Sequence, residues 1–246
     1  MKSYQIHFIR HGATAANREG RYVGVTDTPL SQEGIGKLED MNRRYSYPGA
    51  PVFYVSPLKR CVETCKIIYP QVTPILVPAL SECNFGEWEG KTAEELKEDP
   101  KFQQWLENGQ KTAPPGGESG EDFTIRVLNA FDKLVEGMLR TGTTQAVVVT
   151  HGGVIMTILS AYGIPKAGFY DWIVGNGCGY SVRITPGLWM RDKVMEVYAK
   201  VPKDLDEEQD GDLKYIRNIV REAADRAYGT GETGKKSLTN CSEDYS

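Results

Sequence analysis

Apolar and polar residues follow two alternating patterns along the first 202 residues. Short runs of consecutive apolar residues are typical of strands that are buried in a sheet. Longer stretches between them have apolar residues three or four positions apart, which predicts helices that bury one side. The expected strands are 4–9, 52–56, 75–77, 146–150, 180–184 and 195–201.

Several of the expected helices also carry start signals. Ser31 is a good N-cap for a helix that runs to Arg44, and SPLKRCVETCKIIY predicts a helix at 56–69 with Pro57 in its first turn. An apolar stripe predicts a helix over 123–139. Strands that alternate with helices predict an α/β fold, with helices on both faces of a mainly parallel sheet. Further helices are expected at 92–109, as one or two short polar ones, and directly after 151–153.

Three of the strands end in residues that could do chemistry. The first ends at Arg-His-Gly (10–12), the second at Ser-Pro (56–57) with Arg60 nearby, and the fourth at Thr-His-Gly-Gly (150–153). Ligands of parallel sheets bind beyond the carboxyl ends of the strands, so these segments should converge on one rim. Because the chain has only three histidines, two of them at such ends make this rim the candidate site.

Charge and cysteine content narrow the function classes. The net charge is −4, and residues 203–246, with 11 acidic and 7 basic side chains, account for all of it. The neutral body gives no general attraction to nucleic acid or to a membrane, so neither is an expected partner. Five scattered cysteines do not suggest a disulfide framework, and we find no apolar run of membrane-spanning length. We therefore expect a cytoplasmic protein.

The last part of the chain differs from the body. Its composition predicts an acidic linker after Lys203, a short amphipathic helix at 213–228 and a disordered end. The expected domains are thus a catalytic domain at 1–202 and a tail at 203–246. The tail helix is predicted to dock on the body or on a second subunit, so a homodimer is one of two expected states.

Five sequence blocks in fixed order resemble the histidine phosphatase superfamily, in the branch of the phosphoglycerate mutases and α-ribazole phosphatases. They are FIRHGATAANREGRYVGVTDTPLSQEG, SPLKRCVET, LSECNFGEWEG, PPGGES and VVVTHGGVI. The resemblance spans Tyr4 to about Ile184 and leaves out the tail. It implies a three-layer α/β/α sandwich of the phosphoglycerate mutase-like type, no metal or cofactor, and a phosphohistidine intermediate.

The resemblance also implies roles for individual residues. His11 would be the nucleophile, which requires a neutral imidazole, and its ordinary pKa near 6.5 allows this. Arg10, Arg60 and His151 would surround the phosphoryl oxygens, where arginine suits a tetrahedral anion. Two further phosphate contacts are expected, from the side chain of Asn17 and from the backbone N–H of Gly152.

A general acid is also needed, and SECNFGEWEG offers Glu82, Glu87 and Glu89. The family pattern places the acid at Glu82, and we interpret Glu87 and Glu89 as loop charges. Ser81 departs from the arginine that is common at its position in the family.

We predict hydrolysis of a small phosphorylated metabolite. A mutase must hold a bisphosphate and needs extra cations, yet the stretch 92–122 has no arginine, three lysines and eight carboxylates. The alternatives are a cofactor-dependent phosphoglycerate mutase and a non-catalytic phosphate-binding module. A non-catalytic module is expected to have lost the nucleophile or the acid, whereas His11 and Glu82 are both present.

Weaker signals have plain structural interpretations. His7 is expected to be a core histidine with one hydrogen-bond partner. Cys61 and Cys65 are expected to pack rather than to bind metal. For three aromatic residues an apolar specificity pocket and core packing both stay open: Phe102, Trp105 and Phe123.

Overall fold

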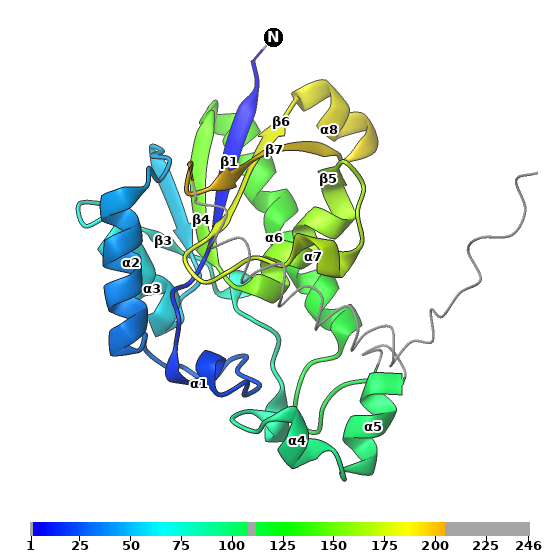
Figure 1. Cartoon of the computed structure of the whole chain (residues 1–246). Coiled ribbons are helices and arrows are strands. Elements are labelled where there is room, and N and C mark those ends of the chain that lie inside the picture. The colour runs from blue at the N-terminus through cyan, green and yellow to red at the C-terminus, as the bar shows by residue number, and fades with distance from the viewer. Residues whose placement is uncertain (1, 108–111, 205–246) are drawn as a thin grey trace, which may run out of the picture.

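The structure is a computed structural model that describes residues 2–107 and 112–204 (Figure 1). The linker, helix and tail expected beyond residue 204 lie outside the described residues. The strands are β1 (Tyr4–Arg10), β2 (Val52–Val55), β3 (Ile75–Leu76), β4 (Gln145–Thr150), β5 (Gly163–Ile164), β6 (Gly179–Ile184) and β7 (Met195–Val201). The α-helices are α1 (Ala15–Arg18), α2 (Gln32–Arg44), α3 (Lys59–Ile68), α4 (Ala93–Leu96), α5 (Pro100–Glu107), α6 (Gly120–Thr141), α7 (Gly152–Tyr162) and α8 (Pro186–Asp192).

The strands form one sheet in the order β3-β2-β4-β1-β6-β7-β5. Its β3-β2-β4-β1 half is parallel throughout, whereas β6 runs antiparallel to both β1 and β7. The prediction of a mainly parallel α/β sheet is confirmed. All three strands whose ends carry candidate residues lie side by side in the parallel half, so their carboxyl ends share one edge.

Helices cover both faces of this sheet, with α2 and α3 on one side and α6 and α7 on the other (Figure 1). The alternation of β1 shows how the strands serve both cores, because Ile6 and Phe8 pack with α6 and α7 while Ile9 packs with α2 and α3. Strand β4 divides its valines in the same way. Among the described residues, we find no helix with the length and apolar character needed to cross a membrane.

Most expected helices are present, but the predicted start of one helix, α3, is wrong. Ser31 caps α2, which ends at Arg44 as expected. Helix α3 begins at Lys59, so Pro57 lies before the helix and not in its first turn. The cause is long-range: the backbone N–H of Ser56 bonds to Val149 of β4 and continues the strand pairing.

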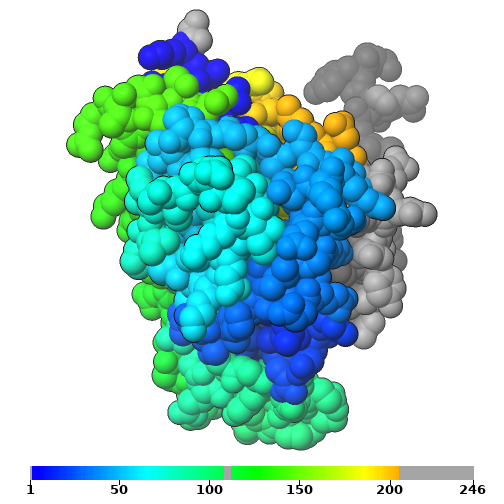
Figure 2. Space-filling model, turned by 90° about the vertical axis from the view of Figure 1, so that its left-hand side faces the viewer, coloured from blue at the N-terminus to red at the C-terminus, as the bar shows by residue number. Residues whose placement is uncertain are grey.

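Helices α4 and α5 form a small lobe away from the sheet (Figure 1), at the bottom of the space-filling view (Figure 2). The lobe has its own apolar core, in which Trp88, Phe102 and Trp105 are nearly fully buried against one another. Phe123 is buried in the main core instead. Core packing is therefore the structural role of all three aromatic residues left open above.

Candidate active site

The three strand ends meet at one point beyond the parallel half of the sheet. The backbone N–H of His11 donates to the carbonyl of Thr150 at 2.9 Å, which holds the ends of β1 and β4 together. The rings of His11 and His151 lie 5.2 Å apart between centroids, at 62°. His151 Nε2 shares a hydrogen bond of 2.8 Å with Ser56 Oγ, which follows β2. The convergence expected from the strand order is what the structure shows.

His11 is held in one tautomer. Its Nδ1 lies 2.7 Å from the carbonyl oxygen of Gly12, and because a carbonyl only accepts, Nδ1 carries the proton. The lone pair is then on Nε2. Burial, followed by the charges of Arg10 and Arg60, lowers the pKa of His11 well below 6.5. A neutral imidazole with a free Nε2 lone pair is the form that can attack phosphorus.

His151 is the N-cap residue of α7 and is fully buried. Burial, followed by the neighbouring His11 and the arginines, lowers its pKa well below 6.5. The Cys61 sulfur lies 3.5 Å from Nε2 on the ring that Ser56 also contacts. The ring is therefore held in place and neutral.

Arg10 approaches the site from the end of β1. Its Nη1 donates to the carbonyl of Val174 at 2.7 Å, while its Nε is buried without a partner in the described part of the chain. A buried guanidinium N–H without an acceptor costs free energy. An anionic ligand at this point would supply that acceptor.

Arg60 is almost completely buried near the start of α3. Its Nη1 and Nη2 donate to the carbonyls of Thr26 at 2.9 Å and Gly24 at 2.6 Å. These bonds to the loop after α1 fix the plane of the guanidinium. Arg60 is thus a buried, hydrogen-bonded group and not a solvent-exposed charge on the helix surface.

Glu89 has a structural role that sequence reasoning missed. Its carboxylate accepts from the backbone N–H groups of Val25 and Thr26, each at 2.8 Å, from the Thr26 hydroxyl, and from the N–H of Phe85 at 3.2 Å. It therefore holds the loop whose carbonyls orient Arg60. The interpretation of Glu89 as a loop charge is wrong, whereas Glu87, two residues earlier, is exposed as expected of a loop charge.

Asn17 lies on α1, where it closes a capping box with Thr14. Its Oδ1 accepts from the backbone N–H and the hydroxyl of Thr14, each at 3.1 Å. Because Oδ1 is occupied by donors, the amide nitrogen is the group left to bind a ligand. Its donation to phosphate stays a prediction that this orientation supports.

Glu82 lies in the segment that follows η1 (Pro78–Leu80). Its side chain reaches the start of α7, after the fourth strand end. Its Oε2 accepts from the backbone N–H of Gly153 at 3.0 Å, and its Oε1 accepts from that of Cys83 at 3.1 Å. Burial raises the pKa of Glu82 above its ordinary value of 4.5, against the opposing effect of these two bonds and the two arginines. A raised pKa favours the protonated form that a general acid requires.

The two glycines at the start of α7 have different constraints. A Cβ on Gly152 would make only ordinary contact with Arg10, at 3.4 Å from Nε. A Cβ on Gly153 would lie 2.4 Å from the Glu82 carboxylate. The close approach that demands glycine is therefore at Gly153, which sequence reasoning did not single out. The expected phosphate contact of Gly152 stays a prediction.

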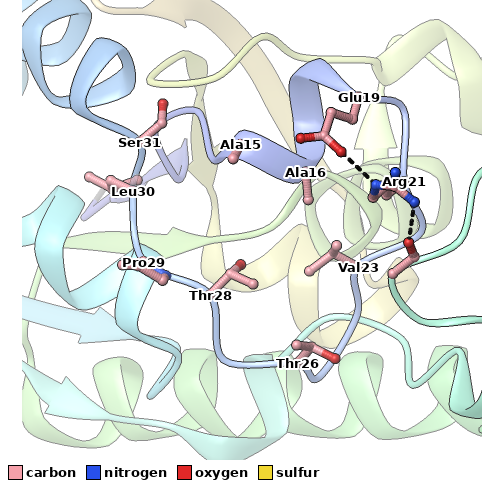
Figure 3. A pocket seen from close by; sticks show the side chains of 11 residues that line it. Ala15, Ala16, Glu19, Arg21, Val23, Thr26, Thr28, Pro29, Leu30 and Ser31 are labelled. Carbon is pink, nitrogen blue, oxygen red and sulfur yellow. Dashed lines mark hydrogen bonds and ion pairs between the residues drawn. The ribbon is translucent and has the colours of Figure 1, made fainter.

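A separate pocket of about 380 Å³ lies beside α1, within the loop that leads to α2 (Figure 3). Its lining includes Ala15, Ala16, Val23 and Thr28, and none of the predicted site residues. Arg21 closes one side of it by bonding to Glu19 and to the carbonyl of Gly90 (Figure 3). The pocket is thus not the candidate site itself.

The weaker sequence signals have the expected structural roles. His7 is buried and shares one hydrogen bond with Ser181. Cys61 and Cys65 are buried and pack with apolar residues of α2 and α3.

The geometry agrees with what comparison to known proteins finds. The model of the histidine phosphatase superfamily, branch 1, matches residues 6–196. This chain belongs to that superfamily. It is 26% identical over 189 residues to the adenosylcobalamin/α-ribazole phosphatase of Salmonella typhimurium, covering 75% of this chain and 92% of the relative.

The chain is also similar to a protein that is named a mutase and not a phosphatase. A 2,3-bisphosphoglycerate-dependent phosphoglycerate mutase of Gloeobacter violaceus is 33% identical over 161 residues, which is 61% of this chain and 72% of the relative. Among solved structures, the α-ribazole phosphatase of Shigella flexneri superposes with a TM-score of 0.68 at 26% identity, covering 79% of this chain and 95% of that one. The family and the fold predicted from the sequence blocks are confirmed.

Proposed function

We propose that the protein is a metal-independent phosphomonoesterase that hydrolyses a small phosphorylated metabolite through a phosphohistidine on His11. The observation that carries the proposal is the state of His11, with Nδ1 bonded to Gly12 and a neutral ring beside two arginines. Arg10, Arg60 and His151, with Asn17 and the N–H of Gly152, would bind the phosphoryl oxygens. Phosphoryl transfer needs mainly such positioning and charge stabilisation.

The reaction has two steps. In the first, His11 Nε2 bonds to phosphorus as the ester P–O bond breaks, and Glu82 donates its proton to the leaving oxygen. In the second, water attacks the phosphohistidine while Glu82 takes a proton from it, and the P–N bond breaks to release phosphate and neutral His11. Glu82 is protonated again at the end, so the cycle closes.

The experiment is turnover of p-nitrophenyl phosphate by the full chain in the presence of a chelator. We expect activity in the wild type, none in His11→Ala, and a covalent phosphate on the wild type that survives alkali and is lost in acid. An active His11→Ala variant would overturn the assignment of the nucleophile. Glu82→Gln should lose about 100- to 10,000-fold in turnover and retain phosphate binding.

The mutase is the alternative that the Gloeobacter violaceus relative favours. Against it, residues 92–122 have no arginine, and Lys97 within them pairs with Glu94. Incubation with 3-phosphoglycerate and 2,3-bisphosphoglycerate tests it, because a mutase forms 2-phosphoglycerate and a phosphatase releases phosphate. A non-catalytic module would turn over neither ester.

Three expectations stay predictions. The tail at 203–246 as a separate unit and the homodimer concern residues almost all outside the described part of the chain. The expected cytoplasmic location fits the unpaired thiols of Cys61, Cys65 and Cys83.

A further inference from the structure

Arg126 on α6 is a half-buried arginine that the proposed reaction does not use. A guanidinium has five N–H donors, and here every one of them has an acceptor. Nε and Nη2 each donate to the Glu118 carboxylate at 2.8 Å. The other bonds go to three backbone carbonyls, of Ala79 at 2.9 Å, Ser81 at 3.0 Å and Glu82 at 3.3 Å. Arg126 therefore binds the chain on the N-terminal side of Glu82 and at Glu82 itself.

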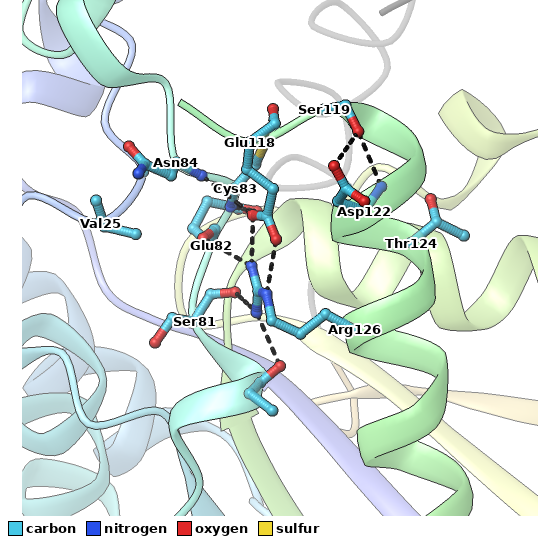
Figure 4. Close-up of polar contacts among 12 residues, drawn as sticks. Val25, Ser81, Glu82, Cys83, Asn84, Glu118, Ser119, Asp122, Thr124 and Arg126 are labelled. Atoms are coloured by element: carbon cyan, nitrogen blue, oxygen red, sulfur yellow. Dashed lines mark hydrogen bonds and ion pairs between the residues drawn. The ribbon is translucent and has the colours of Figure 1, made fainter. Parts of the chain in front are cut away.

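Glu118 binds the chain on the other side of Glu82. Its backbone N–H donates to the carbonyl of Asn84 at 2.8 Å, and its carboxylate accepts from the N–H of Asn84 at 3.4 Å. Its own carbonyl accepts from the thiol of Cys83 at 3.8 Å. Figure 4 shows the Glu118 and Arg126 side chains pointing toward each other, with the chain from Ser81 to Asn84 beside them.

The loop that carries Glu118 is itself packed against the same segment. The backbone N–H of Glu87 donates to the carbonyl of Pro115 at 2.9 Å. A Cβ on Gly117 would lie 2.5 Å from the Asn84 carbonyl, and one on Gly86 would lie 2.1 Å from that of Pro115. The backbone of the PPGGES block is thus in direct contact with the backbone that follows Glu82. This close approach explains the glycines at positions 86 and 117.

We propose that Arg126 and Glu118 are positioning residues that hold Glu82 at the distance from the leaving oxygen that proton transfer requires. This inference rests on the proposed function, in which Glu82 is the acid. The pair acts on Glu82 through the backbone, since the Arg126 donors go to carbonyls and to Glu118, not to the Glu82 carboxylate. Both side chains are largely shielded, with 27% of Arg126 and 17% of Glu118 exposed, so water cannot fully replace the bonds.

The choice of ester separates this role from general structural support. Phenol has a pKa of about 10, like tyrosine, so its departure needs a proton, whereas p-nitrophenolate leaves readily as an anion. We compare kcat/KM for phenyl phosphate and p-nitrophenyl phosphate, because kcat/KM reports the step that expels the leaving group. A displaced acid should slow the hydrolysis of phenyl phosphate far more than that of p-nitrophenyl phosphate.

The test variants of the full chain are Arg126→Met and the milder Glu118→Gln, with Arg140→Met as the control on the exposed end of the same helix. We expect Arg126→Met to lose roughly 10- to 100-fold in kcat/KM on phenyl phosphate and less than about 5-fold on p-nitrophenyl phosphate. Glu118→Gln should show the same selectivity to a smaller degree. Inhibition by inorganic phosphate should stay within about twofold, because the phosphate-binding groups are untouched.

A double variant tests whether the effect passes through Glu82. In Glu82→Gln there is no acid left to position, so adding Arg126→Met should cost little more on phenyl phosphate. Wild-type selectivity between the two esters in both Arg126→Met and Glu118→Gln would overturn the inference, as would full additivity in the double variant. If Arg126→Met does not fold in a thermal unfolding scan, Glu118→Gln alone decides.

The failure of the proposed function has a different signature. A wild type that turns over neither ester, or a Glu82→Gln variant with unchanged selectivity, would contradict the role of Glu82 itself. The positioning inference fails alone when Glu82→Gln shows the selective loss and the Arg126 and Glu118 variants do not.

Discussion

The carboxylate of Glu82 accepts a hydrogen bond of 3.0 Å from the backbone N–H of Gly153, the second residue of α7. This contact joins the candidate acid to the strand end that carries His151. It is possible only because residue 153 has no side chain, since a Cβ there would lie 2.4 Å from Glu82 Oε1. The geometry of the acid therefore depends on a glycine next to the one expected from the motif.

Gly153→Ala should displace Glu82 and lower kcat/KM on phenyl phosphate by roughly 10- to 100-fold. The protein should stay folded, because alanine is the better helix former. The matched control is Gly137→Ala within α6, where a Cβ meets nothing within 4 Å. We expect the control to keep full activity and to gain up to ~1 kcal/mol in unfolding free energy. Wild-type activity in Gly153→Ala would show that Glu82 can shift without cost.

Glu89→Ala should weaken phosphate binding. Without its carboxylate, the N–H groups of Val25 and Thr26 lose their acceptor, and the loop no longer fixes Arg60 through the Gly24 and Thr26 carbonyls. We expect the inhibition constant of inorganic phosphate to rise about tenfold, which corresponds to ~1.4 kcal/mol.

The neighbouring Glu87 provides the control for this experiment. Its side chain is exposed, so Glu87→Ala removes the same charge two residues away. The bonds of Glu89 to Val25 and Thr26 stay in place in this variant. Equal effects of the two variants would mean that charge, and not the loop contact, sets phosphate affinity.

Local pattern was enough to predict much of the fold. The stripe around Phe123 predicted α6, and Ser31 correctly marked the start of α2, because periodicity and capping depend on residues close in sequence. The two-residue strand β5 and the helix α8 were missed. Such short elements leave too few residues for a period to show.

The parts of the site that could not be predicted depend on distant contacts. Glu87 and Glu89 are the same residue type in one short loop, and only the approach of Thr26, 63 positions earlier, gives the second a role. The same holds for the start of α3, which is set by the pairing of Ser56 with β4. For the two glycines after His151, the motif does not indicate which one faces Glu82.

His7 should make the folded state sensitive to acid. Burial, with a smaller effect of Lys203, lowers its pKa from 6.5 to about 4. Between these values the unfolded chain binds a proton at this residue and the folded chain does not. The stabilisation is therefore complete above pH 6.5 and is lost as the pH falls toward 4. For this residue alone, the unfolding free energy should drop by about 2 kcal/mol between neutral pH and pH 5.

The variant His7→Asn isolates that effect, because asparagine can bond to the Ser181 hydroxyl but does not titrate in this range. His11 and His151 also have lowered pKa values, so the wild type and the variant should both lose stability in acid. The difference between them is the contribution of His7. Urea unfolding of both proteins at neutral pH and at pH 5 measures it, and we expect the variant to lose about 2 kcal/mol less. An equal loss in both proteins would mean that His7 is already protonated when folded, in conflict with its burial in β1.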